Sequence, residues 1–221
     1  MLTIHAADLL VPGDRRPALP DGAVLVRDRR LAAIGPLGTL TAAHPAARVR
    51  RWPGLLTPGL VNPYGPELLE HAYHPDPREA GELGTEPLTG EALAALALTE
   101  ARRGGSARRG VQRLLAHGVV AVAGELPTPA VRDAVHRAGL GVLPRPAAPD
   151  GPAVLDPLRG RSLAEAIAGP LPPEGEQPED GGGPEATFAV FDVPDEAALT
   201  GRGAGTCVAT VVAGRLLYRQ R

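Results

Sequence analysis

Two histidines and the carboxylates that follow them have residue types and a spacing that suit metal chemistry. His71 and His74 are three positions apart, and Asp76 and Glu79 come shortly after them. On a helix end, positions i and i+3 share a face, so two imidazoles can face one zinc or iron ion with Asp76 or Glu79 as third ligand. The alternative is a polar helix end whose histidines contact exposed carbonyl groups. We expect the second arrangement and keep the metal site as the alternative.

Two further residues have side chains that could take part in catalysis, although neither has a partner group nearby in the sequence. Glu125 follows an apolar run, at the strand end where barrel enzymes place catalytic groups. A loop carboxylate is the simpler interpretation, so Glu125 and Asp76 are catalytic candidates without a complete catalytic group. Cys207 lies in a β run with no adjacent histidine, and we expect a buried small hydrophobic residue.

The charge of the chain excludes several classes of function. The net charge is −2, which gives no electrostatic reason to bind nucleic acid or a membrane surface. All 23 basic residues are arginine, so no lysine is present to form a Schiff base or a carboxylated metal ligand. Two arginine pairs, 102–103 and 108–109, predict a local basic patch. We expect a solvated helix face there, with an acidic partner as the alternative.

Both ends of the chain predict β structure. Apolar runs separated by short polar turns indicate a hairpin near each end and a strand before the second hairpin. These runs are 23–26, 31–34, 187–193, 207–212 and 215–218. We expect 1–57 and 185–221 to pair into one domain.

The middle of the chain changes period. An Ala/Leu-rich helix is predicted over 91–103, and Ser106 is predicted to cap a second helix that ends before Gly118. A buried strand follows at 119–122, and then a helix that begins at Thr128 and Pro129. Alternating helices and strands with short glycine turns are typical of βα units.

Three stretches carry a resemblance to a known family. They are 20–35, with its Pro-Asp-Gly-Ala-Val-Leu-Val opening, 56–62 with Leu-Thr-Pro-Gly-Leu-Val-Asn, and 186–192 followed by 211–215. In this order the chain resembles the amidohydrolase superfamily, with imidazolonepropionase-like and related deaminase-type hydrolases as the nearest members. The resemblance implies a small β domain built from both chain ends around a βα barrel. It also implies metal-dependent hydrolysis of carbon–nitrogen bonds other than peptide bonds.

The same resemblance shows a departure at the metal site. In the family, the segment after Pro-Gly-Leu-Val-Asn ends in His-x-His, whose imidazoles bind the metal. Here the matching positions are Tyr64 and Pro66. Proline has no ligand atom and tyrosine is a poor substitute for an imidazole, so we expect no bound metal cofactor. Zinc or iron remains the alternative, at the relocated histidine site.

The length predicts an incomplete barrel. Each βαβ unit needs about 30 residues and a full eightfold barrel about 250, whereas at most 58–184 is available. We therefore predict a mixed α/β fold, with a sandwich-type composite β domain and a reduced βα segment at 58–150. From 169 to 184 glycine, proline and acidic residues dominate, which predicts a flexible linker over 151–184.

These observations favour a non-catalytic binding or scaffold protein. An incomplete parallel sheet leaves an open edge, so we expect a homo-oligomer or a protein partner that covers it. One alternative is a metal-dependent hydrolase of the imidazolonepropionase or deaminase kind with a relocated site. Another is a small-ligand module in the mouth of the half-barrel, with Tyr64 and Glu125 as polar contacts. The single cysteine and the absence of a signal-like start predict a cytoplasmic protein.

Overall fold

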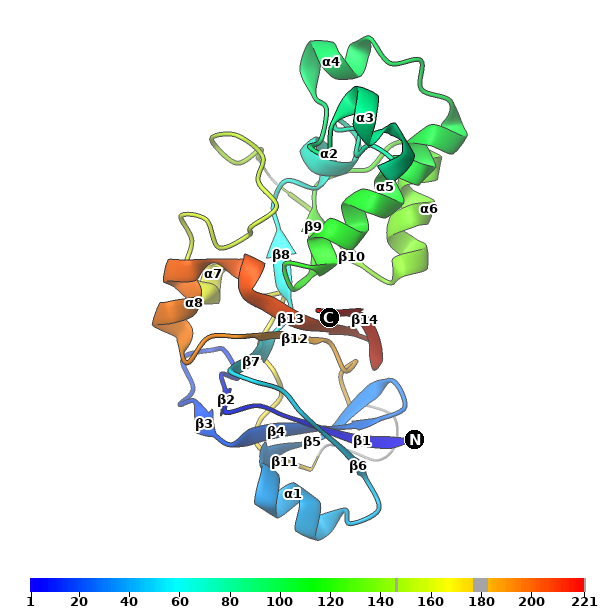
Figure 1. Ribbon diagram of the computed structural model, residues 1–221. Helices are drawn as coiled ribbons and strands as arrows, with labels where there is room; N and C mark the ends of the chain where they lie inside the picture. Colours follow the sequence, from blue (N-terminus) through cyan, green and yellow to red (C-terminus); the bar gives the residue numbers. More distant parts are fainter. Residues whose placement is uncertain (146, 177–182, 221) are drawn as a thin grey trace.

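The computed structural model describes residues 1–145, 147–176 and 183–220, with the β structure at one end and most helices at the other (Figure 1). The N-terminal part consists of β1 (Leu2–Ala6), β2 (Leu9–Leu10), β3 (Leu19–Pro20), β4 (Gly22–Arg27), β5 (Arg30–Pro36), α1 (Leu37–Ala43), β6 (Arg48–Arg51) and β7 (Leu55–Pro58). The C-terminal part consists of α7 (Leu163–Ala166), β11 (Gly175–Glu176), β12 (Phe188–Phe191), α8 (Glu196–Arg202), the 3₁₀ turn η2 (Ala204–Thr206), β13 (Cys207–Val212) and β14 (Arg215–Arg219).

The middle of the chain forms a separate group of elements. In chain order they are β8 (Leu60–Asn62), α2 (Gly65–Leu69), the 3₁₀ turn η1 (Pro77–Glu79), α3 (Ala80–Leu83), α4 (Gly90–Ala94), α5 (Glu100–Leu115), β9 (Val119–Ala123), α6 (Pro129–Ala138) and β10 (Gly141–Leu143).

Two sheets pack together to form the β end. The first has the strand order β11-β5-β4-β1-β6, and the second has the order β14-β13-β12-β7-β2-β3. Between them lies an apolar core that includes Val24 and Ile34 from the first sheet and Phe188 and Val211 from the second. The other face of the first sheet is covered by Leu37 and Leu40 of α1. Strands β4 and β5 are therefore buried on both faces, which explains their unbroken apolar runs.

The second sheet joins the two ends of the chain. Strand β12 pairs antiparallel with β7 from the N-terminal part and with β13 from the C-terminal part. Strand β2 pairs parallel with β7, and β13 forms a hairpin with β14 through Ala213 and Gly214, both at positive φ. The prediction that both ends contribute to one small β domain is confirmed.

The third sheet is a short parallel one, with the order β10-β9-β8. Its crossover connections carry α5 between β8 and β9 and α6 between β9 and β10. Helix α5 turns Val111, Leu114 and Leu115 towards the core that contains β9. Parallel strands joined by helical crossovers form βα units, which fits the predicted mixed α/β fold with a reduced, barrel-derived segment.

The helix boundaries differ from the prediction in one place. The sequence suggested a helix over 91–103 and a second one capped by Ser106, but α4 ends at Ala94 and α5 begins after Thr99. Thr99 is the N-cap, with its hydroxyl accepting from Arg102 N at 3.3 Å. Ser106 is buried inside α5 instead, where its small side chain faces the loop at 72–74. The predicted α6 agrees with the structure, from Pro129 in its first turn to Gly139 in the left-handed conformation after its end.

The stretch 151–184, predicted as a flexible linker, packs against the rest of the molecule where it is described. Leu158, Leu163 and Leu171 are buried, and β11 pairs with β5. These scattered leucines supply apolar area that the glycine and proline content had obscured. Residues 177–182 lie outside the described part of the chain. Among the described residues, no helix has both the length and the apolar character needed to cross a membrane.

Candidate functional site

The carboxyl ends of the parallel strands meet where a barrel enzyme would bind its metal. Asn62, the last residue of β8, is fully buried there. Its amide nitrogen donates to the carbonyls of Val154 and Leu155 at 2.9 and 3.0 Å, and its oxygen accepts from Tyr64 N at 2.8 Å. The side chain thus ties the segment at 154–155 across the end of β8, which closes this corner with structural hydrogen bonds.

Tyr64 and Pro66, at the positions where the resemblance implies metal ligands, have side chains that do not fit a metal. The Tyr64 hydroxyl donates to the Asp150 carbonyl at 3.0 Å. Pro66 lies in the first turn of α2 and has no side-chain donor atom, and its ring packs close to Gly124 after β9. Both residues therefore have structural roles at this edge.

An ion pair occupies the same edge of the sheet. Arg145, which follows β10, donates to both carboxylate oxygens of Glu67 in α2, at 2.8 and 3.0 Å, and to the Pro63 carbonyl at 2.8 Å. A bidentate guanidinium–carboxylate pair fixes both groups in one plane. It connects the ends of β8 and β10, where an intact barrel would leave room for a substrate.

The histidine cluster is not assembled as a metal site. Helix α2 ends at Leu69, so His71 and His74 do not share a helical face as the i and i+3 spacing suggested. His71 is exposed, whereas His74 is 1% exposed. Within the ranges 1–145, 147–176 and 183–220, no group of three or more His, Cys, Asp or Glu side chains is placed to hold a metal ion.

His74 is held as a neutral buried imidazole. Its Nε2 is 2.8 Å from the Leu68 carbonyl, so this nitrogen carries the proton, while Nδ1 is buried with no hydrogen-bond partner among the described atoms. Burial lowers the pKa of His74, with the hydrogen bond to Leu68 acting in the opposite direction. The backbone N–H of His74 donates to Ser106 Oγ at 2.8 Å, which fixes this loop on α5.

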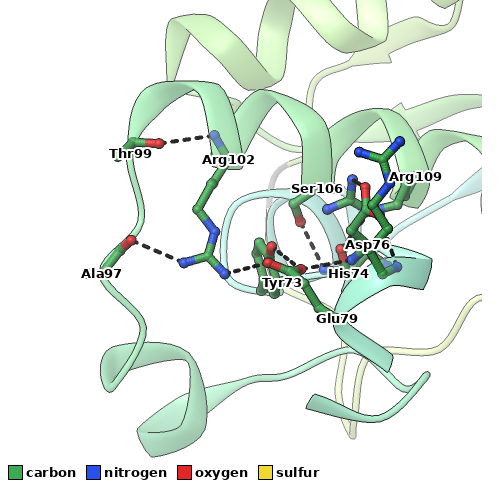
Figure 2. A network of polar contacts seen from close by, with 10 residues as sticks. Tyr73, His74, Asp76, Glu79, Ala97, Thr99, Arg102, Ser106 and Arg109 are labelled. Carbon is green, nitrogen blue, oxygen red and sulfur yellow. Dashed lines mark hydrogen bonds and ion pairs between the residues drawn. The ribbon is translucent and has the colours of Figure 1, made fainter. Parts of the chain in front are cut away.

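Asp76 and Glu79 belong to a polar network on α5 instead (Figure 2). The Glu79 carboxylate accepts from the Tyr73 hydroxyl at 2.6 Å, from Asp76 N at 2.9 Å and from Arg102 at 2.7 Å. These hydrogen bonds lower the pKa of Glu79 to about 2, and the bond from Tyr73 has the largest effect. Asp76 caps η1 and forms an ion pair with Arg109 at 3.3 Å. Through these contacts each carboxylate stabilises the fold of this loop.

The other candidates are also placed apart from one another. Glu125 is exposed in the loop after β9, and neither His71 nor Asp76 forms a hydrogen bond or ion pair with it within the described residues. Cys207 is 1% exposed, and burial raises the pKa of its thiol to about 11. A thiol of this kind is not a nucleophile near neutral pH. Cys207 therefore packs as a small hydrophobic residue, as expected.

Several of the residues that define this region were not singled out from the sequence. Asn62 and Arg145 close the strand ends, and Tyr73 helps to organise the loop on α5. Ser106, which the sequence suggested as a helix cap, holds the same loop instead. Asn62 is the only asparagine in the chain and directly follows a buried strand, which is a usable signal. Arg145 has no such signal, because its partner Glu67 lies 78 positions away in the sequence.

A comparison with protein families matches one segment of the chain. Residues 22–47 match the family model of the bacterial imidazolonepropionase-like composite domain. This match covers the hairpin of β4 and β5 and the helix α1, and it confirms the resemblance of this segment to an imidazolonepropionase-like composite domain. No curated protein matches the chain.

Solved structures give matches of low similarity. They include an ochratoxinase from A. niger (22% identity, TM-score 0.45, covering 65% of this chain and 31% of that one) and the E. coli guanine deaminase (16%, 0.44, 65% and 35%). A Helicobacter pylori aminofutalosine deaminase is similar at 17% identity, with a TM-score of 0.42 and coverages of 65% and 33%. The chain thus spans about a third of the length of these proteins.

Proposed function

We propose that this amidohydrolase-like chain is a non-catalytic protein that acts by binding a protein partner. The observation that carries the proposal is the state of the strand ends at β8 and β10. Tyr64 and Pro66 offer no ligand set, and Asn62 and Arg145 use their polar groups to close this corner. A metal-dependent hydrolase needs metal ligands and an open coordination position there.

The binding role rests on the open edge of the parallel sheet. Strand β10 is at the end of the order β10-β9-β8, and Val142 and Leu143 on it are 49% and 39% exposed. An unpaired apolar strand edge is a template for pairing with another chain. We propose that a second copy of this chain covers β10, and a different protein partner is the alternative outcome. We also propose a cytoplasmic location, which the single cysteine supports.

The competing function is hydrolysis of carbon–nitrogen bonds at a relocated metal site. It requires His71, His74 and Asp76 to gather around one ion, with zinc or iron as the metal. Against it, His74 is buried on the Leu68 carbonyl and Asp76 is paired with Arg109. A rearrangement of the loop 70–79 would be needed, with loss of the contacts between this loop and α5.

Elemental analysis of protein purified without chelator or histidine tag tests the two functions. We expect less than about a tenth of an equivalent of zinc, iron, manganese or nickel, because structural and catalytic sites bind metal tightly. Near one equivalent, lost in the His71→Ala variant, would support the hydrolase instead and justify assays with amide and cyclic-amidine substrates. His71 is exposed, so its removal leaves the fold intact. Removal of His136 on α6 is the matched control.

A further inference from the structure

A second site lies on α5, away from the strand ends. A pocket of about 380 Å³ opens between the N-terminal half of α5 and the loop at 73–79. Four of its nine lining residues are arginines. The lining residues are Tyr73, Asp76, Arg78, Glu79, Ala101, Arg102, Gly105, Arg108 and Arg109. Tyr64, Pro66 and Glu125 are not among them, so this pocket is separate from the position of the family's metal.

Two of the arginines are fixed before any ligand arrives. Arg102 donates to Glu79 at 2.7 Å and to the Ala97 carbonyl at 3.3 Å, and Arg109 donates to the His74 carbonyl at 2.8 Å (Figure 2). Both guanidinium groups also lie over the ring of Tyr73, at 5.2 and 5.9 Å from its centre. Cation–π contacts and ion pairs restrict the rotamers of these long side chains. Part of the entropy cost of ordering arginines around a ligand is therefore already met by the fold.

The other two arginines have no partner within the described residues. Arg78 and Arg108 are exposed, and neither guanidinium has a hydrogen bond or ion pair to a described residue. The four arginines face two carboxylates, Asp76 and Glu79, which leaves an excess of two positive charges at the pocket. Gly105 leaves space beside the arginines because it has no side chain. An added Cβ there would lie 3.4 Å from the Arg109 guanidinium.

We propose that this pocket binds a small dianion of the phosphate-monoester class. Guanidinium groups bind phosphate through paired, charge-assisted hydrogen bonds, and a phosphate monoester carries close to two negative charges near neutral pH. Arg78 and Arg108 provide the free donors, and Arg102 and Arg109 provide the fixed positive field. The volume suits a small molecule. The site is independent of the proposed loss of catalysis, because it would exist in a metal-free or a metal-bound chain.

The proposal is tested by titrating the full chain with inorganic phosphate at constant ionic strength, with binding followed by calorimetry. The wild-type chain should show saturable binding. An Arg78→Gln/Arg108→Gln variant should bind at least about tenfold more weakly, since both free donors are removed. Both side chains are exposed and neither forms a hydrogen bond or ion pair within the described residues, so the variant should keep the wild-type melting temperature.

The matched control is Arg103→Gln. Arg103 lies on the same helix, but it lines a different pocket, next to Val131 of α6. Its removal should leave phosphate binding unchanged. Absence of saturable binding in the wild-type chain would overturn the proposal. So would equal affinity in the double variant, or an equal loss in Arg103→Gln, because that would indicate a general effect of surface charge. None of these results depends on metal content.

Discussion

At the scale of the residue, the buried polar side chains are used to hold segments together. His5 of β1 is an example. It is 4% exposed, stacks at 6.1 Å from Trp52 and meets the edge of Phe188 across the sandwich. Its Nδ1 accepts from Trp52 Nε1 at 3.2 Å, which requires the neutral imidazole. Burial, and then the nearby positive charge of Arg50, lower the pKa of His5 to about 4.

This pKa predicts a loss of stability in mild acid. The unfolded chain takes up a proton at His5 below about pH 6.5, whereas the folded chain does so only near pH 4. The stabilisation is therefore complete above pH 6.5, falls as the pH drops to 4, and totals about 3 kcal/mol. His5→Gln keeps an acceptor for Trp52 but does not titrate. The free energy of unfolding of the wild-type chain minus that of this variant, measured in urea, should therefore be smaller at pH 4.5 than at pH 7. A constant difference would contradict the assignment.

Asn62 gives a second prediction at this scale. Asn62→Ala removes the three hydrogen bonds that close the end of β8 and takes the Asn62 donor away from the partly buried carbonyls of Val154 and Leu155. We expect a loss of about 2–4 kcal/mol in the free energy of unfolding. Gln112→Ala, an exposed amide on α5, is the control and should change it by less than about 0.5 kcal/mol. Similar values for the two variants would mean that water replaces the Asn62 bonds.

At the scale of the element, α5 depends on the absence of a side chain at one position. Gly110 faces the loop, and a Cβ there would lie 2.7 Å from His74 Nε2 and 2.8 Å from Leu69. At Gly104, on the same helix, the nearest atom would be Ala130 Cβ at an ordinary 3.5 Å. Gly110 therefore lets the helix approach the loop, whereas Gly104 only weakens the helix.

Alanine at the two positions should have opposite effects. Gly104→Ala should stabilise the chain by up to about 1 kcal/mol, because alanine is the better helix former. Gly110→Ala gains the same propensity but must displace the buried His74, so we expect a net loss of about 1–3 kcal/mol. Thermal and urea unfolding of the two variants measure both. Stabilisation by Gly110→Ala would show that the loop at 69–74 shifts at little cost.

The sequence predicted the elements whose signals are local. The hairpin of β4 and β5, the strand β9 and the helix that starts at Pro129 each have their turn or cap residues next to an apolar run. The candidate site was harder to predict from the sequence. The histidine spacing implied a shared helix face, but α2 stops at Leu69, and Ser106 contacts the loop across 32 positions rather than capping a helix. Contacts over such separations leave no local pattern, so the loop on α5 could not be derived from spacing.

At the scale of the whole molecule, the strand edges differ in how they are protected. The edge strand β6 exposes Val49, 42% accessible, but flanks it with arginines at 48, 50 and 51. The short β3 ends in Pro20, and β14 has an arginine at each end. Charges and proline discourage pairing with another chain. Strand β10, with the sequence Gly-Val-Leu, has no charge or proline within its bounds, and the Arg145 that follows it is paired with Glu67. The strand adjoins a largely apolar pocket of about 500 Å³.

This contrast predicts which edge associates. If a second copy covers β10, light scattering at micromolar concentration should give twice the mass of one chain, and Val142→Asp should return it to the mass of one. Pairing with a second chain would bury the new carboxylate and remove its hydration, and this free-energy cost disfavours the dimer. Val49→Asp places the same charge on β6, whose arginines already disfavour pairing. Because β6 is not the proposed interface, this variant should remain a dimer. Both residues are exposed, so neither change removes a core contact.

Two results would contradict this assignment. A wild-type chain that stays monomeric would mean that a different protein, and not a second copy, covers β10. Loss of the dimer in Val49→Asp alone would mean that the interface lies at β6.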